Sequence, residues 1–223
     1  MKSRLYVIVF MVAIAAVFGA AVSGLHLVSQ PRLERNRRLR MQEAYVRVFG
    51  LADGGGLSAT EVGELVDSRL RMDETVVDPE TGEAFTLIEA RSEDGAVKAY
   101  GFRFGGMGLW GPIEGVISLS PDLRRTTGLV VLEQKETPGL GGRIEEPIFT
   151  EQFSQDGGVY VALPEEKDSP VLTISSDVPQ KGTERYRRHV DAITGATQTC
   201  MAMERILNEN LVQFGRAMAA RGS

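Results

Sequence analysis

The residues best suited to chemistry lie near the C-terminus, in the stretch from Asp191 to Thr199 (DAITGATQT). Three hydroxyl side chains and two very small residues come just before a predicted helix. Gly195 and Ala196 allow a large ligand or another protein to approach the backbone closely. The start of a helix also presents free N–H groups and a positive dipole, which favour a phosphate. The stretch is therefore a candidate site for a phosphate-containing ligand.

A simpler interpretation assigns the same hydroxyl groups to helix capping. Thr194, Thr197 or Thr199 could each satisfy a free N–H group at the start of the helix. The helix itself is predicted by apolar residues that recur along one face, namely Met201, Ile206, Leu207, Leu211, Phe214 and Met218. Spacing alone favours the cap, so the ligand-binding interpretation needs further motifs.

One further motif is the loop Glu136–Gly142 (ETPGLGG). Its chemistry is that of a rigid proline turn among glycines, which exposes backbone N–H and C=O groups to the polar edge of a ligand. The alternative interpretation is a plain surface loop.

A third motif is the segment Gly105–Pro112 (GGMGLWGP), which contains the only tryptophan of the chain. It lacks the Lys-Ser/Thr pair of a phosphate-binding P-loop and is not a dinucleotide-binding GxGxxG motif. Either this segment is a tight turn with a buried aromatic anchor, or it is a flexible loop that presents Leu109 and Trp110 to a flat ring system.

Composition excludes several other functions. The chain has 223 residues, a net charge of −5, one cysteine and two histidines. No basic patch interleaved with aromatic residues indicates a nucleic-acid surface. His26 and His189 lie far apart, so no metal site is predicted. Cys200 is predicted to be a small buried side chain rather than a thiol acidified by the helix start. No nucleophile signature is present, so no catalytic residue is predicted.

The N-terminus carries a long apolar segment. Residues 5–31 contain no Asp, Glu, Lys or Arg, and a bilayer-spanning helix needs about 20 apolar residues. A cleaved signal peptide is the alternative, with a cleavage site near Ala21-Val22-Ser23. A signal sequence has a shorter apolar region of about 7–15 residues, so the segment is predicted to be an uncleaved transmembrane anchor.

The remaining pattern predicts an α+β domain with a mostly antiparallel sheet, onto which the last helix packs. Helices are expected over residues 33–51 and 58–70, the second opening with the capping box Ser58–Glu61. Alternation and turn residues predict strands over residues 85–90, 97–104, 113–119, 127–134, 160–163 and 171–175. The expected division is a transmembrane anchor (1–31), a helical stem (32–72) and one ligand-binding domain (73–223).

Taken together, the motifs resemble the FMN-binding domain family. Thr194–Thr197, with Asp191 three residues before, resembles the flavinylation motif of that family, and Glu136–Gly141 resembles its Glu-Thr-Pro-Gly-Leu-Gly loop. The family includes the C subunit of the sodium-pumping NADH:quinone reductase (Nqr) and the G subunit of the Rnf complex. The resemblance covers about residues 85 to 215, plus the anchor. Gly108-Leu109-Trp110 resembles the Nqr version, whereas the modest length favours the Rnf version.

The resemblance implies a cofactor and the residues that hold it. Thr197 would be esterified to the phosphate of FMN by a separate Mg-dependent flavin transferase that uses FAD as donor. Position 194 is Thr where Ser is common in the family, a change that keeps the hydroxyl. The implied FMN-binding residues are Thr197, Thr194, Gly195, Ala196, Asp191, Glu136, Thr137, Gly139, Leu140, Leu109 and Trp110.

The resemblance also implies a function. The chain would be the covalent-FMN electron-transfer subunit of a membrane-bound, ion-translocating oxidoreductase complex, with no active site of its own. The alternative is a membrane-tethered FMN-binding sensory or relay module outside an ion pump. Its partners would be the membrane, flavin and iron–sulfur subunits of such a complex and the transferase, with no nucleic acid.

Two signals disagree on topology. The family places its soluble domain on the periplasmic side of the inner membrane. The arginines at positions 32, 35, 37, 38 and 40 follow the span, and the positive-inside rule would put the domain in the cytoplasm. Long folded domains translocate largely regardless of charge, so a periplasmic domain is expected.

Overall fold

The structure is a computed structural model that describes residues 2–52, 56–154, 157–161 and 170–221, with side chains described from residue 6 onward. The chain forms two compact units, Met1–Met41 and Gln42–Ser223.

The first unit consists of most of helix α1 (Lys2–Val48). The helix contains an 18-residue window of mean hydropathy 2.5, and by length and composition it could cross a membrane. Residues 33–48 are helical, as predicted, but they continue α1 without a break through Pro31, and the helix ends at Val48 rather than Leu51. Proline removes one helical hydrogen bond, but strong helix formers such as Leu, Arg, Glu and Gln surround it. The predicted apolar N-terminal helix is confirmed.

The last turns of α1 belong to the second unit and are buried there. Gly50 has a φ of 55°, and Leu51 N donates to Val46 O at 3.0 Å. This is the Schellman pattern that ends a helix. Ser118 Oγ then donates to Val48 O at 2.8 Å. A Cβ at Gly128 would lie 2.3 Å from the same carbonyl oxygen, so the sheet accepts the helix end only where it has no side chain.

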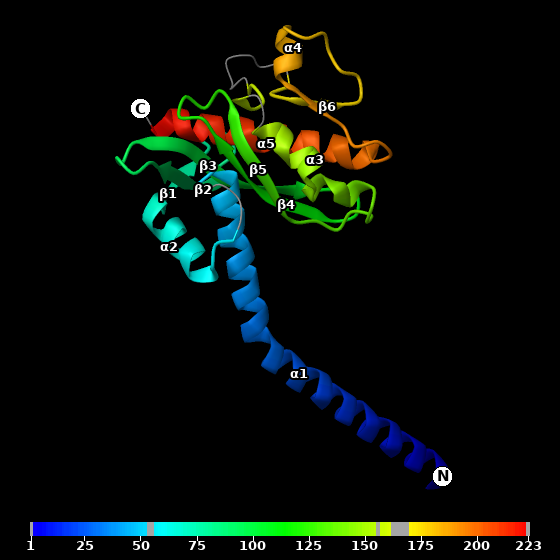
Figure 1. The fold of residues 1–223 in the computed structure, drawn as a ribbon. Coiled ribbons are helices and arrows are strands. Elements are labelled where there is room, and N and C mark those ends of the chain that lie inside the picture. The colour runs from blue at the N-terminus through cyan, green and yellow to red at the C-terminus, as the bar shows by residue number, and fades with distance from the viewer. Residues whose placement is uncertain (1, 53–55, 155–156, 162–169, 222–223) are drawn as a thin grey trace. The chain divides into compact units, whose positions relative to one another are not determined.

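The second unit is built on a five-stranded antiparallel sheet in the order β1-β2-β3-β4-β5 (Figure 1). The strands are β1 (Leu70–Val77), β2 (Ala84–Arg91), β3 (Val97–Met107), β4 (Pro112–Leu119) and β5 (Thr126–Glu133). The predicted antiparallel sheet is therefore confirmed. Helix α2 (Ala59–Arg69) precedes it, and the predicted capping box between Ser58 and Glu61 is present.

Shorter elements follow the sheet: η1 (Gly141–Glu145), α3 (Pro147–Thr150), η2 (Glu151–Phe153), β6 (Thr173–Ser175), α4 (Glu184–Arg187) and β7 (His189–Asp191). Strands β6 and β7 pair in parallel, which the sequence does not predict. The expected strand at residues 160–163 is an isolated bridge between Tyr160 and Arg125, and its second half lies outside the described residues.

Helix α5 (Thr197–Arg221) covers one face of the sheet. Phe214 stacks on Phe102 of β3 with ring centroids 4.2 Å apart, and a Cβ at Gly106 would lie 2.6 Å from Ile206 Cγ1. The prediction that Met201 belongs to the buried apolar face of the helix is wrong, because this residue is 58% exposed. Met203 is buried instead, since it lies three residues before Ile206 and shares its face.

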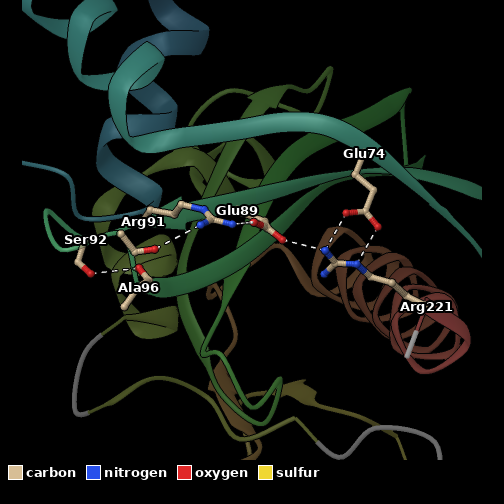
Figure 2. A network of polar contacts seen from close by, with 7 residues as sticks. Glu74, Glu89, Arg91, Ser92, Ala96 and Arg221 are labelled. Atoms are coloured by element: carbon tan, nitrogen blue, oxygen red, sulfur yellow. Dashed lines mark hydrogen bonds and ion pairs between the residues drawn. The ribbon is translucent and has the colours of Figure 1, made fainter. Parts of the chain in front are cut away.

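Ion pairs fasten the end of α5 to β1 and β2. Arg221 lies between Glu74 and Glu89 (Figure 2), with Nε 2.7 Å from Glu74 Oε1 and Nη2 3.0 Å from Glu89 Oε1. Nearby, Arg216 donates to both carboxylate oxygens of the fully buried Asp78, at 2.9 and 2.6 Å. Such paired, bidentate bonds are the strong form of the interaction.

The bond from Arg216 holds the pKa of Asp78 far below its usual 3.8. A carboxyl whose pKa is depressed by folding stabilises the fold above its unfolded pKa and loses that contribution as the pH falls through the folded pKa. We expect Asp78→Asn to lower the free energy of unfolding by about 1.5–3 kcal/mol at neutral pH. In urea titrations of the full chain in detergent, the difference from wild type should be constant between about pH 5 and 8 and shrink below about pH 4. An undiminished difference in acid would contradict this assignment.

Candidate functional site

The Glu136–Gly142 loop is a sharp turn that exposes a leucine. Leu140 N donates to Thr137 O at 3.1 Å, and Gly139 between them has a φ of 75°. Proline followed by a glycine with positive φ is the pattern of a type II turn. Thr137 and Gly139 are exposed, and the Leu140 side chain is 47% exposed at the tip.

A second turn of the same kind precedes α5. Ala196 N donates to Ile193 O at 3.0 Å, and Gly195 has a φ of 82°. Ala196 is buried. Cys200 N then donates to Ala196 O at 2.9 Å, within the first turn of the helix. Thr197 is therefore the first residue of α5, where N–H groups lack partners within the helix.

The two turns meet in space. A Cβ at Gly195 would lie 3.3 Å from Leu140 Cδ2, so the leucine lies directly beside the glycine. Thr199 Oγ1 donates to Glu136 Oε2 at 2.7 Å. Both the apolar and the polar contact therefore join motifs that are some sixty residues apart in the sequence.

The third motif joins them through the same glutamate. The backbone N–H groups of Leu109 and Trp110 donate to Glu136 Oε1 at 2.9 and 3.1 Å. The side chains of Leu109 and Trp110 are 49% and 68% exposed, so the interpretation of Trp110 as a buried anchor is wrong. The loop keeps its backbone on Glu136 and turns its apolar side chains to solvent.

The hydroxyl groups do not act as the expected helix cap. Thr194 and Thr197 are both exposed, and within the described parts of the chain neither hydroxyl forms a hydrogen bond. The Thr199 hydroxyl bonds Glu136 rather than the helix backbone. The Thr197 hydroxyl at the helix start is thus accessible to a reacting group.

Asp191 lies on the strand that leads into the turn. Its side chain is 66% exposed, with Oδ1 3.0 Å from His189 Nε2, and its backbone N donates to Gln152 Oε1 at 2.7 Å. These contacts do not involve Glu136, so Asp191 lies before the turn and outside the hydrogen-bond network of Glu136.

Cys200 is buried, as predicted, and burial raises the pKa of its thiol.

The sequence indicates only a helix-capping role for Thr199 and no role for Arg205. Arg205 Nη2 donates to Met107 O at 2.6 Å, which fixes the end of β3 just before the Leu109-Trp110 loop. The Thr199 hydroxyl bonds Glu136 instead of capping the helix. Neither partner could be found without the fold, because both bonds span more than sixty residues.

A cavity of about 350 Å³ lies elsewhere, near β6, α4 and β7. It is lined by Pro170, Thr173, Ser175, Asp177, Pro179, Glu184, Arg185, Arg188 and His189. None of the predicted site residues lines it. The candidate site is instead an exposed surface made by three loops.

The residues of this surface fit a phosphorylated flat ring. Thr197 offers an accessible hydroxyl at a helix start, where a phosphate is favoured. Leu109, Trp110 and Leu140 offer exposed apolar surface of the kind that lines ring-binding sites. The glycine at position 195 leaves room beside Leu140 that a side chain would fill.

Comparison with known proteins identifies a family model that spans the loops of this surface. Residues 108–212 match the family model described as FMN-binding domain, and this match confirms the resemblance that the motifs predict. The matched residues include all three loops.

Relatives of this chain include C subunits of Na(+)-translocating NADH-quinone reductases. The protein of Vibrio campbellii is 34% identical over 94 residues, which are 42% of this chain and 33% of that protein. The protein of Pseudomonas aeruginosa is 25% identical, with 84% of this chain and 83% of that protein covered.

Two crystal structures share the fold. NqrC of Shewanella oneidensis superposes with a TM-score of 0.66 at 18% identity, covering 84% of this chain and 99% of that one. The corresponding Na(+)-translocating NADH-quinone reductase protein of Parabacteroides distasonis gives 0.65 at 22% identity, covering 85% and 96%. At these identities the agreement establishes the α+β fold.

Proposed function

We propose that this chain is the FMN-carrying electron-transfer subunit of a membrane-bound, Nqr-type oxidoreductase complex. The observation that supports the proposal most strongly is that three loops meet beside the accessible hydroxyl of Thr197, within the region that matches the FMN-binding domain. The names of the relatives support an Nqr-type complex.

Each part of the surface has a role in holding FMN. Thr197 Oγ1 would carry the cofactor as a phosphodiester, and the start of α5 would stabilise the remaining phosphate charge by about 0.3–1 kcal/mol. Leu109, Trp110 and Leu140 would cover the apolar ring and limit its contact with water. FMN supplies the redox chemistry, accepting electrons in pairs and passing them on singly.

Covalent attachment would keep the cofactor on a protein whose domain faces the cell exterior. A separate flavin transferase would add FMN to Thr197, with Asp191 and the small pair Gly195-Ala196 serving its recognition. The exposure of Asp191 and Gly195 supports this role, because an enzyme must approach the turn from outside.

The proposal includes a place in the cell and a division of the chain. Residues 1–31 would anchor the protein in the inner membrane, residues 32–72 would form a stem, and residues 73–223 would form a periplasmic FMN-binding domain. The G subunit of an Rnf complex remains the alternative assignment within the family, and an FMN module outside an ion pump remains the alternative function.

The test is to express the full chain with and without a flavin transferase, denature it and record in-gel flavin fluorescence. We expect a fluorescent band only with the transferase, with FMN mapped to Thr197 by peptide mass spectrometry. A dark band from folded protein, with the transferase shown active on a control substrate, would contradict the proposal. Purified neighbouring membrane subunits would distinguish a complex from an isolated module.

A further inference from the structure

Glu136 is buried, whereas the side chains of the Leu109-Trp110 loop that it bonds are exposed. Its exposed fraction is 4%, against 49% for Leu109 and 68% for Trp110. A buried carboxylate is costly unless hydrogen bonds compensate it. The partners of Glu136 therefore indicate what the residue is for.

Both carboxylate oxygens are already occupied by the protein. Oε1 accepts from Leu109 N and Trp110 N, and Oε2 accepts from Thr199 Oγ1. Accepting on both oxygens and donating from neither is the behaviour of an ionised carboxylate. Hydrogen bonds to a charged acceptor are stronger than those between neutral groups.

Two glycines make room for this carboxylate. A Cβ at Gly108 would lie 2.6 Å from Glu136 Oε1, and one at Gly141 would lie 2.4 Å from Thr199 Oγ1. Both distances are shorter than a Cβ tolerates. The glycines in the two loop motifs are thus matched to the carboxylate and its partner, rather than only to turn geometry.

We propose that Glu136 is a positioning residue that does not bind FMN itself but holds the Leu109-Trp110 loop against the start of α5. The reason for positioning the loop rests on the proposed function, because the loop would cover the ring of FMN. The hydrogen bonds that support the positioning role lie within the protein and do not depend on FMN. By joining the loop to Thr199, two residues after Thr197, Glu136 sets the position of the apolar side chains relative to the attachment site.

The conservative variant Glu136→Gln separates positioning from other effects. Gln Oε1 can accept the same two backbone N–H groups, and its Nε2 can donate to the Thr199 hydroxyl, which accepts as well as donates. Glu136→Ala removes all three bonds. The positioning role therefore predicts failure of the Ala variant and rescue by Gln.

The experiment uses the full chain in detergent, produced without the transferase. Hydrogen exchange of a peptide covering residues 105–112 reports the two backbone N–H groups, and anisotropy of Trp110, the only tryptophan, reports the loop. We expect Glu136→Ala to speed exchange of Leu109 and Trp110 at least tenfold and to lower the anisotropy, with both near wild type in Glu136→Gln.

Asp78→Asn is the matched control, because it also disturbs a buried carboxylate, but one bonded to Arg216 near the C-terminal end of α5, whereas Thr197 begins that helix. Because Asp78→Asn also lowers the free energy of unfolding, exchange of residues 105–112 is compared with that of peptides from the core strands β2 and β4. Asp78→Asn should not accelerate residues 105–112 more than these strands, and it should leave the Trp110 anisotropy unchanged. Wild-type exchange in Glu136→Ala, or an acceleration in Glu136→Ala that the core strands share equally, would overturn the positioning role.

A second measurement adds the transferase and counts covalent FMN per chain. We expect a severalfold loss in Glu136→Ala and near-normal loading in Glu136→Gln and Asp78→Asn. Full loading of Glu136→Ala would overturn the proposal. If wild type takes up no FMN, the proposed function fails, while the exchange and anisotropy results on the unloaded protein still decide the role of Glu136.

Discussion

Thr197→Ala is expected to abolish covalent flavin and to leave the fold intact. The Thr197 side chain is exposed at the first position of α5, and within the described residues its hydroxyl forms no hydrogen bond. Removing the hydroxyl breaks no hydrogen bond among the described residues, while a phosphodiester needs that oxygen. The measurement is flavin fluorescence of the denatured full chain after expression with the transferase, together with a urea titration of the same sample.

Two neighbouring variants sharpen this prediction. Thr197→Ser keeps a hydroxyl and should retain covalent flavin. Thr194→Ala removes the other exposed hydroxyl of the turn and should also retain it, at a lower yield if the transferase reads that position. Stoichiometric covalent flavin on Thr197→Ala would contradict the assignment of Thr197 as the attachment residue. An equal loss of flavin from Thr194→Ala would not distinguish Thr197 from Thr194 as that residue.

Phe214→Ala is expected to destabilise the second unit by about 3–5 kcal/mol, the usual cost of truncating a buried phenylalanine. Phe214 is fully buried. Its ring stacks on Phe102 at 4.2 Å and meets Phe85 edge-on at 5.9 Å. The cavity left behind would loosen α5 on the sheet, and that helix carries Thr197 and Thr199. Chemical denaturation of the full chain measures the loss.

The matched control lies on the same helix. Met201→Ala removes an apolar side chain of comparable length, but one that is 58% exposed, so its cost should stay within about 0.5 kcal/mol. Similar losses in Met201→Ala and Phe214→Ala would show that α5 does not pack as described. Flavin loading should fall in Phe214→Ala only to the extent that the protein unfolds.

The two expected effects show how the fold and the site depend on each other. α5 contributes Phe214 and Ile206 to the core, and at its other end it presents Thr197 and bonds Glu136 through Thr199. Packing of the helix on β3 therefore determines where the attachment residue lies. Phe214→Ala and Thr197→Ala both change α5, but the first should lower stability and the second should remove the attachment oxygen. Measuring stability and flavin loading on the same samples will separate the two effects.

Local features were predictable because their signals are local. Alternating apolar residues identified β2, β3, β4 and β5, the Ser58–Glu61 pair marked the start of α2, and the apolar run indicated the N-terminal helix. The tight turns at Pro138-Gly139 and Thr194-Gly195 follow from residues that tolerate their backbone angles. Each of these patterns spans only a few residues, so the chain specifies them without reference to distant partners.

The assembly of the site depends on tertiary structure. Leu140 beside Gly195, and Glu136 bonded to Leu109, Trp110 and Thr199, join segments that only the five-stranded sheet and α5 bring together. The exposure of Trp110 and Met201 could not be read from their apolar character, because burial depends on which face the packed helix and loop present. Residue types and spacing thus determined the turns and the candidate chemistry, whereas long-range packing decided which of those groups share one surface.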